Sequence, residues 1–273
     1  MGLPEEQWLS VDEGWGRHAV EFATLCEPTN CREYVALHHR LEVGSGDRLL
    51  DVACGSGLAV ELAALLGAQC AGIDASPRLL AVARDRSPDA DLRIGDMQAL
   101  PWGDATFDVV TSFRGIWATT PKAVAEVYRV LVPGGRVGLT VWGHIKASTG
   151  AWALAPLALA ATPKVENQAA MVALGRPGAG EELLQQTGFC DVERFDIPFT
   201  FEFADPEAYA RAIASTGPAY EAMEAVGEAA FLQAAVELAR EQVREGLPLR
   251  ARVAVVGYKA RKSADRPRAA RRD

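Results

Sequence analysis

Hydrophobic and polar positions alternate with two different periods between residues 48 and 142. Short apolar runs of strand length are separated by stretches in which apolar residues recur at helical spacing. These segments predict strands at 48–53, 69–74, 91–95, 107–111 and 136–142, and helices at 58–66, 77–85 and 121–131. Strands that alternate with helices are joined by crossover connections, so this region predicts a parallel sheet with helices on both faces.

The flanking regions have a more helical pattern. Residues 1–47 contain Trp8 and Trp15 and then apolar residues at helical spacing, which predicts an N-terminal helical cap. Residues 143–250 predict a lid over the carboxyl edge of the sheet, with helical segments at 151–162, 181–188 and 206–244, the last divided near Gly217. Strands are expected at 191–203 and 252–258, and they complete a main domain that extends over residues 48–258.

Charge is distributed unevenly along the chain. Residues 259–273 hold seven Lys and Arg against two Asp, a composition that predicts a disordered basic tail. The formal net charge of the whole chain is −8, so the tail's +5 leaves −13 on the rest. An acidic body repels phosphate backbones, and a nucleic-acid partner is therefore not expected.

Composition limits the remaining classes of protein. The 273 residues, 49% of them hydrophobic, suffice for one large α/β domain, and no run reaches the roughly 18 apolar residues of a membrane span. The acidic N-terminus lacks the features of a signal sequence, so the expected location is cytoplasmic. Five cysteines without a C-x-x-C pair predict reduced thiols, and no acidic trio indicates a metal site. The sequence does not indicate an oligomeric state.

The first predicted strand is followed by a glycine-rich turn. Asp51 precedes Gly55 and Gly57, and the helix at 58–66 follows directly. Glycines remove side chains where a ligand must approach the backbone, and the amino end of the next helix favours a negatively charged group. The turn therefore predicts a nucleotide-type ligand, although many nucleotide and phosphate sites use such a turn.

Two further aspartates follow at the ends of the next strands. Asp74 ends the second strand about 17 residues after Gly57, where a carboxylate can accept hydrogen bonds from both hydroxyls of a ribose. Asp96 follows the third strand, where it can accept from the amino group of an adenine, while Met97 offers an apolar face and a backbone amide. The alternative for each aspartate is a turn or helix-capping role, which competes most at Asp74 because Ser76 and a proline follow.

These features occur within five motifs that follow one another between residues 48 and 142. They are LLDVACGSG at 49–57, GIDAS at 72–76, GDMQALPW at 95–102, FDVV at 107–110 and EVYRVLVPGGR at 126–136. In their order and spacing the chain resembles the class I S-adenosylmethionine-dependent methyltransferases. The resemblance is greatest to the small-molecule branch that includes the ubiquinone and menaquinone methyltransferases.

The resemblance implies a Rossmann-like, seven-stranded, mostly parallel sheet of order 3-2-1-4-5-7-6, with S-adenosyl-L-methionine across its carboxyl edge. It divides the domain into a cofactor half, residues 48–142, and an acceptor half, residues 143–250. The cofactor-binding residues that it implies are Asp51, Ala53, Gly55, Gly57, Asp74, Ala75, Asp96, Met97, Ser112 and Arg114. Ala53 departs from the family, which most often has glycine there, and alanine is expected to cost little if its φ is negative.

Methyl transfer from a sulfonium needs few side chains, because the leaving group is already activated. A base is required only if the acceptor must lose a proton. His144, just beyond the fifth predicted strand, is the first candidate base and His18 is the second; a structural or solvent-facing role is the alternative for both. Arg114 is expected to hold a carboxylate of cofactor or acceptor, and Trp8 and Trp15 to close over the sulfonium.

The predicted function is transfer of a methyl group to an oxygen, nitrogen or carbon atom of a small, partly apolar metabolite. The lid is rich in Ala, Leu, Phe and Tyr, which favours an apolar acceptor of secondary metabolism over a strongly charged one. One alternative is methylation of protein or RNA. Two observations disfavour this alternative. The body of the chain is acidic, and residues 112–115 differ from the Asn/Asp-Pro-Pro-aromatic motif of nucleic-acid amino methyltransferases. The other alternative is a regulatory protein that binds S-adenosylmethionine without catalysis.

Overall fold

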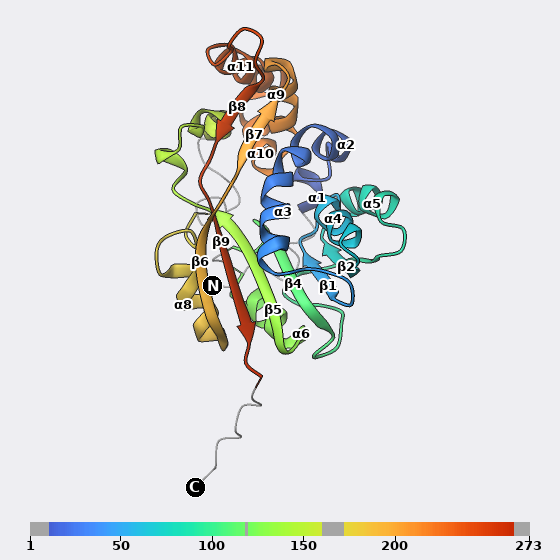
Figure 1. Ribbon diagram of the computed structural model, residues 1–273. Helices are drawn as coiled ribbons and strands as arrows, with labels where there is room; N and C mark the ends of the chain where they lie inside the picture. Colours follow the sequence, from blue (N-terminus) through green and yellow to red (C-terminus); the bar gives the residue numbers. More distant parts are fainter. Residues whose placement is uncertain (1–10, 118–119, 160–171, 265–273) are drawn as a thin grey trace.

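The computed structural model describes residues 11–117, 120–159 and 172–264. Its centre is a seven-stranded sheet of order β3-β2-β1-β4-β5-β9-β6 (Figure 1). The first five strands are parallel, and β9 is antiparallel to both of its neighbours. The strands are β1 (Arg48–Val52), β2 (Gln69–Asp74), β3 (Asp91–Ile94), β4 (Phe107–Phe113), β5 (Leu131–Trp142), β6 (Phe189–Ile197) and β9 (Val255–Lys262). Because β9 is the seventh strand of this sheet in chain order, the predicted order 3-2-1-4-5-7-6 is confirmed.

Neighbouring residues of the central strands face two separate hydrophobic cores. Leu49 and Val109 belong to the core that includes α3 (Cys31–Arg40), α4 (Leu58–Leu65) and α5 (Pro77–Arg86). Leu50 and Val110 belong to the core that includes α6 (Pro121–Val130) and α8 (Ala179–Thr187). Successive side chains of a strand point to opposite faces, so continuous apolar strands require helices on both sides.

The described part of the N-terminal cap is mainly helical. It consists of α1 (Val11–Gly14), α2 (Ala19–Glu21), a π-helical turn at Phe22–Cys26, a 3₁₀ turn at Glu27–Asn30, and α3. Helix α1 contacts the lid, whereas α2 contacts α5 beside the sheet. The cap therefore spans both sides of the sheet's carboxyl edge. Trp8, one of the two tryptophans predicted to cover the cofactor, lies outside the described residues.

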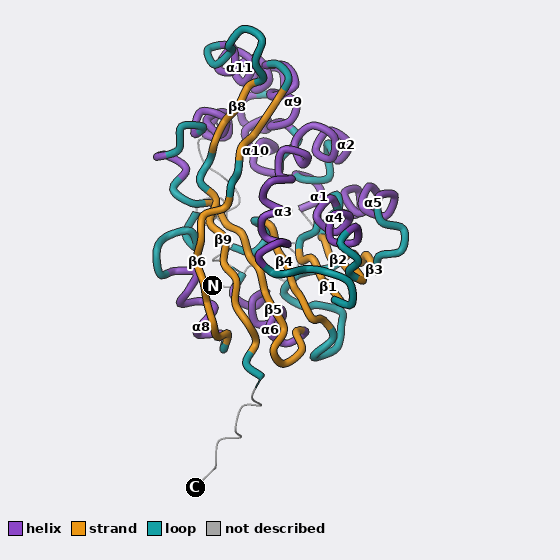
Figure 2. The backbone as a smooth tube through the Cα atoms, in the orientation of Figure 1, coloured by secondary structure: helices purple, strands orange, loops and turns teal. Residues whose placement is uncertain are grey.

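A two-stranded ribbon extends the sheet into the lid (Figure 2). Strand β6 continues into β7 (Thr200–Phe203), and β8 (Leu249–Arg252) continues into β9; β7 pairs with β8 as β6 pairs with β9. The sequence predicted one continuous strand in place of β6 and β7, and one in place of β8 and β9. The break after β6 coincides with Pro198, which has no N–H to donate to a ladder.

Three helices connect the ends of the ribbon and form the lid. They are α9 (Pro206–Ala214), α10 (Gly217–Val226) and α11 (Glu228–Arg240), and α9 packs against α11. The predicted division near Gly217 is confirmed, and a second division at Gly227, where φ is +86°, was not predicted. The predicted helix at 151–162 is a 3₁₀ helix over Ala151–Leu159, and its remaining residues lie outside the described part.

Strand β9 corrects the predicted start of the basic tail. The strand ends at Lys262, so residues 259–262 belong to the sheet. Lys259 forms an ion pair with Glu193 at 2.8 Å, and Lys262 Nζ donates to the carbonyls of Tyr128 and Leu131 at 2.7 Å each. These carbonyls lie at the end of α6, where a cation is favourable. Residues 265–273 lie outside the described part. No helix in the described ranges is long and apolar enough to cross a membrane.

Candidate functional site

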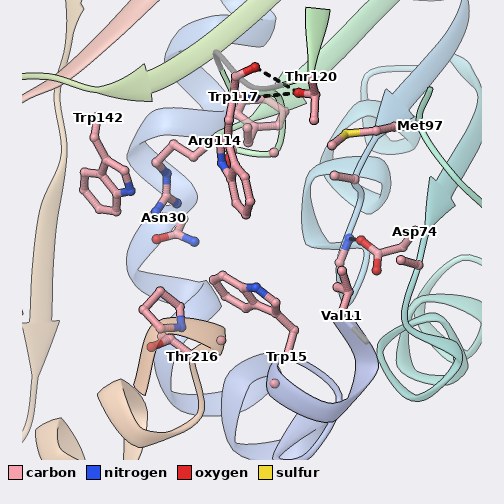
Figure 3. Close-up of a pocket in the computed structure, with 18 of the residues that line it drawn as sticks. Val11, Trp15, Asn30, Asp74, Met97, Arg114, Trp117, Thr120, Trp142 and Thr216 are labelled. Atoms are coloured by element: carbon pink, nitrogen blue, oxygen red, sulfur yellow. Dashed lines mark hydrogen bonds between the residues drawn. The ribbon is translucent and has the colours of Figure 1, made fainter. Parts of the chain in front are cut away.

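A cavity of about 1780 Å³ lies at the carboxyl ends of β1, β2, β4 and β5 (Figure 3). The N-terminal cap and the lid enclose it from the opposite side, through residues such as Trp15 and Thr216. Binding pockets for single small molecules usually measure about 300–1,000 Å³. The cavity therefore has room for two ligands side by side.

Most of the predicted site residues line this cavity. They are Asp51, Ala53, Gly55, Asp74, Ala75, Asp96, Met97, Arg114 and His144. Three others, Gly57, Ser112 and His18, are not among the lining residues. The strand ends were thus located correctly from sequence, whereas individual roles at the turn and in the cap need correction.

Asp74 is held in place by the turn that it faces. Its Oδ2 accepts from the N–H of Gly55 at 2.8 Å and its Oδ1 from the N–H of Ser76 at 2.9 Å, while 8% of the residue is exposed. Ser76, and not Asp74, caps α5, because its hydroxyl accepts from the N–H of Leu79 at 3.1 Å. Each carboxylate oxygen keeps a lone pair for a further donor. Asp74 can therefore order the turn and still accept bonds from a ligand.

Two more aspartates border the same side of the cavity. Asp96 Oδ1 accepts from the N–H of Gln98 at 2.9 Å, which fixes the carboxylate in the turn after β3. Asp51 is buried, accepts from the hydroxyl of Thr111 at 2.7 Å, and has its pKa raised to about 8 because burial disfavours the charged form. These carboxyl groups give the side of the cavity near β1 to β3 an acidic character.

Gly57 and Ser112 support the site from outside the cavity. Gly57 has a φ of +84°, and a Cβ there would lie 2.6 Å from the Cβ of Ala83 on α5. Its lack of a side chain thus permits the contact between α4 and α5, not the approach of a ligand. The hydroxyl of Ser112 donates to the carbonyl of Val52 at 2.7 Å and joins β4 to β1. Neither residue is among those that line the cavity, and their direct contact with the cofactor stays a prediction.

Ala53 adopts the left-handed conformation. Its φ is +60°, so the condition under which alanine was expected to cost little, a negative φ, is not met. The left-handed region costs an L-residue about 1–2 kcal/mol. The turn between β1 and α4 therefore contains local strain at Ala53.

A glutamate of the N-terminal cap occupies the amino end of α4. Glu27 Oε1 accepts from the N–H of Leu58 at 3.3 Å, and its other oxygen bonds to Ser56 and pairs with Arg86. The carboxylate satisfies part of the helix end and complements its dipole. A carboxylate of the protein thus already lies at this helix end, where a negative group of the ligand was predicted. Residue 27 gives no local signal of this role, because only folding brings it beside residue 58.

Arg114 is committed to an internal ion pair. Its guanidinium binds the carboxylate of Glu33 at 2.9 Å, and Glu33 is completely buried. The guanidinium also stacks on the rings of Trp142 and Phe199, with 4.7 Å to each centroid. Arg114 thus connects the cap, the end of β4 and the ribbon. It also lines the cavity, and its contact with a ligand carboxylate stays a prediction.

The two candidate bases differ in position. His144 follows β5, is exposed and lines the cavity, whereas His18 precedes α2 and its buried Nε2 has no hydrogen-bond partner in the described residues. Only His144 is placed to meet an acceptor. The described residues also contain no group of three or more His, Cys, Asp or Glu placed to bind a metal.

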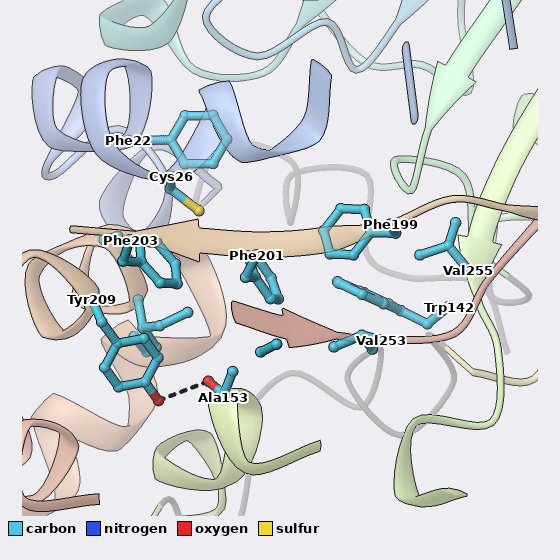
Figure 4. Close-up of a cluster of buried hydrophobic side chains, with 14 of the residues drawn as sticks. Phe22, Cys26, Trp142, Ala153, Phe199, Phe201, Phe203, Tyr209, Val253 and Val255 are labelled. Atoms are coloured by element: carbon cyan, nitrogen blue, oxygen red, sulfur yellow. Dashed lines mark hydrogen bonds between the residues drawn. The ribbon is translucent and has the colours of Figure 1, made fainter. Parts of the chain in front are cut away.

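An aromatic chain leads from the cavity into the lid (Figure 4). Trp142 and Phe199 meet edge to face at 5.4 Å between centroids, Phe199 meets Phe201 at 4.8 Å, and Phe201 stacks on Phe203 at 5.9 Å. Tyr209 of α9 completes the series at 5.4 Å from Phe203. Trp142 and Phe201 also line the cavity. The side of the cavity next to β5 and the ribbon is therefore apolar and supported by a packed core.

A mostly parallel sheet with an antiparallel seventh strand, and a cavity over its carboxyl edge, define the class I methyltransferase fold. Residues 50–139 match the family model described as a methyltransferase domain. A demethylmenaquinone methyltransferase from Symbiobacterium thermophilum is 42% identical over 155 residues, which cover 49% of this chain and 59% of that protein. The chain spans about half the length of the curated relatives that it matches.

Two solved structures show the same fold over nearly all of this chain. The cyclase SpnF matches 97% of this chain and 100% of its own length, with a TM-score of 0.60 at 19% identity. A phosphoethanolamine N-methyltransferase from Haemonchus contortus, solved with S-adenosyl-L-methionine, matches 96% of this chain and 60% of its own, with a TM-score of 0.59 at 18% identity. At these identities the likeness concerns the fold alone.

Proposed function

We propose that this chain is an S-adenosylmethionine-dependent methyltransferase that acts on an oxygen, nitrogen or carbon atom of a small, partly apolar molecule. The observation that carries the proposal is the two-sided cavity. Asp74 and Asp96 lie at its acidic side, whereas Trp142 and Phe201 line its apolar side, and the volume accommodates a cofactor and an acceptor together. The methyltransferase domain match and the relatives named as methyltransferases support the same conclusion.

The residues of the acidic side fit S-adenosylmethionine. Asp74 retains acceptor capacity at the end of β2, where a ribose would lie, and Ile73, Leu79 and Met97 provide apolar walls for an adenine. The oxygens of Asp74 and Asp96 can accept hydrogen bonds from the hydroxyl and amino groups of this ligand. When bound, this cofactor supplies a methyl group on a sulfonium.

The protein's own contribution is to position the acceptor and exclude water. The cap and the lid close the carboxyl edge, so an acceptor against Trp142 would be held beside the cofactor pocket in a largely apolar surrounding. Proximity and exclusion of water are the main accelerating effects for such a transfer. His144 lies at the same edge and is proposed to take a proton from an acceptor that must lose one.

Apolar surroundings also favour an acceptor from natural-product biosynthesis. The relatives' name, demethylmenaquinone methyltransferase, is consistent with an acceptor that contains an apolar ring. SpnF, however, is a cyclase with this fold, so the test must detect methyl transfer itself.

Calorimetry with S-adenosylmethionine, followed by incubation with a panel of small aromatic molecules, tests the proposal. Formation of S-adenosylhomocysteine with a methylated product is the expected result. Cofactor binding without any product would instead support a non-catalytic binding protein, and product formed only with protein or RNA would support the macromolecular alternative. Once an acceptor is found, His144→Ala should lower turnover more than cofactor affinity; an unchanged rate across pH would exclude His144 as the base.

A further inference from the structure

Two polar side chains of the N-terminal cap line the cavity although both residues are more than nine-tenths buried. Asn30 is 3% exposed and Tyr34 is 5% exposed. The amide nitrogen of Asn30 donates to the hydroxyl oxygen of Tyr34 at 3.2 Å. The two residues lie four positions apart at the start of α3. Residues at this spacing are neighbours on one face of a helix, so their polar groups lie together.

This pair has more donor hydrogens than the described residues use. The hydroxyl of Tyr34 and the amide of Asn30 carry three hydrogens, and their mutual bond uses one. Thr29 lies 3.4 Å from the amide oxygen of Asn30 and already donates to the carbonyl of Cys26 at 2.7 Å. Whichever way the amide is oriented, at least one hydrogen has no acceptor among the residues that the structure describes.

An unused donor in a buried wall is unfavourable unless a ligand or water meets it. Leaving such a group without a partner costs about 1–3 kcal/mol. Burial raises the pKa of Tyr34 well above its usual value, so the hydroxyl stays protonated and remains a donor. The pair is thus suited to an oxygen atom that accepts hydrogen bonds.

The surroundings of the pair indicate which part of the cavity it serves. The ring of Phe113 meets the ring of Tyr34 edge to face at 4.6 Å, so an apolar surface borders the donor. In Figure 3, Asn30 lies on the side of Trp142 and Thr216, across the cavity from Asp74 and Met97. The buried charges of Glu27, Glu33 and Arg114 also act on the hydroxyl of Tyr34. The pair therefore lies where this polar cluster meets the apolar wall, across the cavity from the part assigned to the adenosine.

We propose that Asn30 and Tyr34 form an oxygen-binding subsite for the acceptor. The acceptor would be an aromatic ring system whose carbonyl or phenolic oxygen receives a hydrogen bond from this pair while its ring lies against the apolar wall. This inference rests on the proposed function, because only a methyltransferase has a methyl acceptor to bind. It narrows the class of substrate to oxygenated aromatic rings, because a plain hydrocarbon would leave the donor without a partner.

Binding of two matched probes to the full chain tests the subsite. In the presence of S-adenosylhomocysteine, 2-naphthol and naphthalene are titrated against wild type and Tyr34→Phe, and dissociation constants are obtained from tryptophan fluorescence. Wild type should prefer 2-naphthol by roughly tenfold, the equivalent of one net hydrogen bond, and Tyr34→Phe should reduce that preference to about twofold or less. The phenylalanine keeps the ring contact with Phe113, so the variant should fold.

Several results would overturn the proposal. Failure of wild type to bind 2-naphthol, or an equal preference in wild type and variant, would show that the pair does not select an oxygen. A loss of about tenfold in S-adenosylhomocysteine affinity on Tyr34→Phe would assign the pair to the cofactor instead. The proposed function fails separately if wild type does not bind S-adenosylhomocysteine, and the preference for naphthol is then still measurable without it.

Tyr209→Phe is the matched control for the loss of a hydroxyl. Tyr209 is fully buried, donates to the carbonyl of Ala153 at 2.9 Å and belongs to the lid core, and it is not among the residues that line the cavity. This variant should be less stable than wild type and should keep the full preference for 2-naphthol. Loss of the preference in this control as well would mean that the effect comes from general loosening of the fold, and would overturn the assignment.

Discussion

The two sides of the cavity are built by different means. On the cofactor side, polar atoms at strand ends are fixed by backbone groups only a few positions away in the same or the next turn, as at Asp74 and Asp96. On the acceptor side, positions depend on contacts between segments far apart in sequence, such as Glu33 with Arg114 and Ala153 with Tyr209. Short-range bonds therefore fix part of the first side, together with longer-range bonds such as those of Asp74 with Gly55 and Asp51 with Thr111. The second side exists only after the whole chain has folded.

The largest effect is expected from breaking the long-range ion pair. Glu33→Gln leaves the buried guanidinium of Arg114 without its counter-charge, and loss of one partner of a buried pair costs about 3–5 kcal/mol. Denaturant unfolding should show this loss. The exposed pair of Arg32 and Glu202, separated by 3.4 Å, provides the control, because Arg32→Gln should cost less than about 1 kcal/mol. Equal small losses in both variants would mean that the buried pair does not hold the cap to the acceptor side.

The next largest effect is a pH dependence of stability that arises from His38 on α3, the helix that also carries Glu33. Burial lowers the pKa of His38 to about 4, below the 6.5 that it would have when unfolded, and neither ring nitrogen has a partner in the described residues. Between these values the unfolded state binds more protons, so stability should be complete above pH 6.5 and fall toward pH 4, by up to about 3 kcal/mol.

His38→Leu tests that assignment. The variant should remove most of the pH dependence of unfolding between pH 6.5 and 4, and it should not lose stability at neutral pH, because no hydrogen bond of the ring is lost. His39, exposed on the same helix, provides the control, and His39→Leu should keep the wild-type dependence. An unaltered slope in His38→Leu would place the titration elsewhere.

Asp74→Ala tests the cofactor side of the cavity separately from the acceptor side. If the carboxylate makes charge-assisted bonds to the ribose, cofactor affinity should fall by about 1.5–3 kcal/mol in calorimetry. Asp74→Asn separates this role from support of the turn, because the amide oxygen can still accept one backbone N–H. Affinity equal to wild type in a folded Asp74→Ala variant would refute the role. Binding of 2-naphthol, which depends on the other side, should change little.

The smallest effect concerns the strained turn itself. Ala53→Gly should raise the free energy of unfolding by about 1 kcal/mol, because glycine adopts the observed φ of +60° without strain. Ala64 lies exposed within α4, where the same substitution should lower stability by about 1 kcal/mol. A decrease in both variants would show that the left-handed conformation of Ala53 is not a source of strain.

The same contrast explains what the sequence could predict. The strands and the acidic strand ends follow from apolar periodicity and motif spacing, and Asp74 and Asp96 lie where those patterns placed them. The strand order was implied by the family resemblance, and the structure has that order. The role of Gly57 could not be deduced, because the atom that excludes a side chain there belongs to Ala83 on another helix. The ion pair of Arg114 with Glu33 could not be deduced either, because the two residues lie 81 positions apart.

Strand lengths near the lid show a different limit. Alternating residues predicted a strand through residues 191–203, but periodicity cannot show that pairing is interrupted at Pro198 and resumes in a second, smaller sheet. The polar pair of Asn30 and Tyr34 gave no signal either, since one asparagine and one tyrosine are unremarkable until burial and the cavity are known.

Strands β7 and β8 are connected like the two strands of a β-hairpin, but residues 204–248 replace the short turn. Phe203 and Leu249 are paired across the ribbon, so the chain leaves the sheet and returns to it at neighbouring points. A turn of two to five residues is enough to join two such strands. The helices of residues 204–248 can therefore be exchanged or rebuilt without a new path for the strands below them. Evolution or protein engineering can in this way keep the cofactor site and replace the lid helices, so that the same site is combined with a different methyl acceptor.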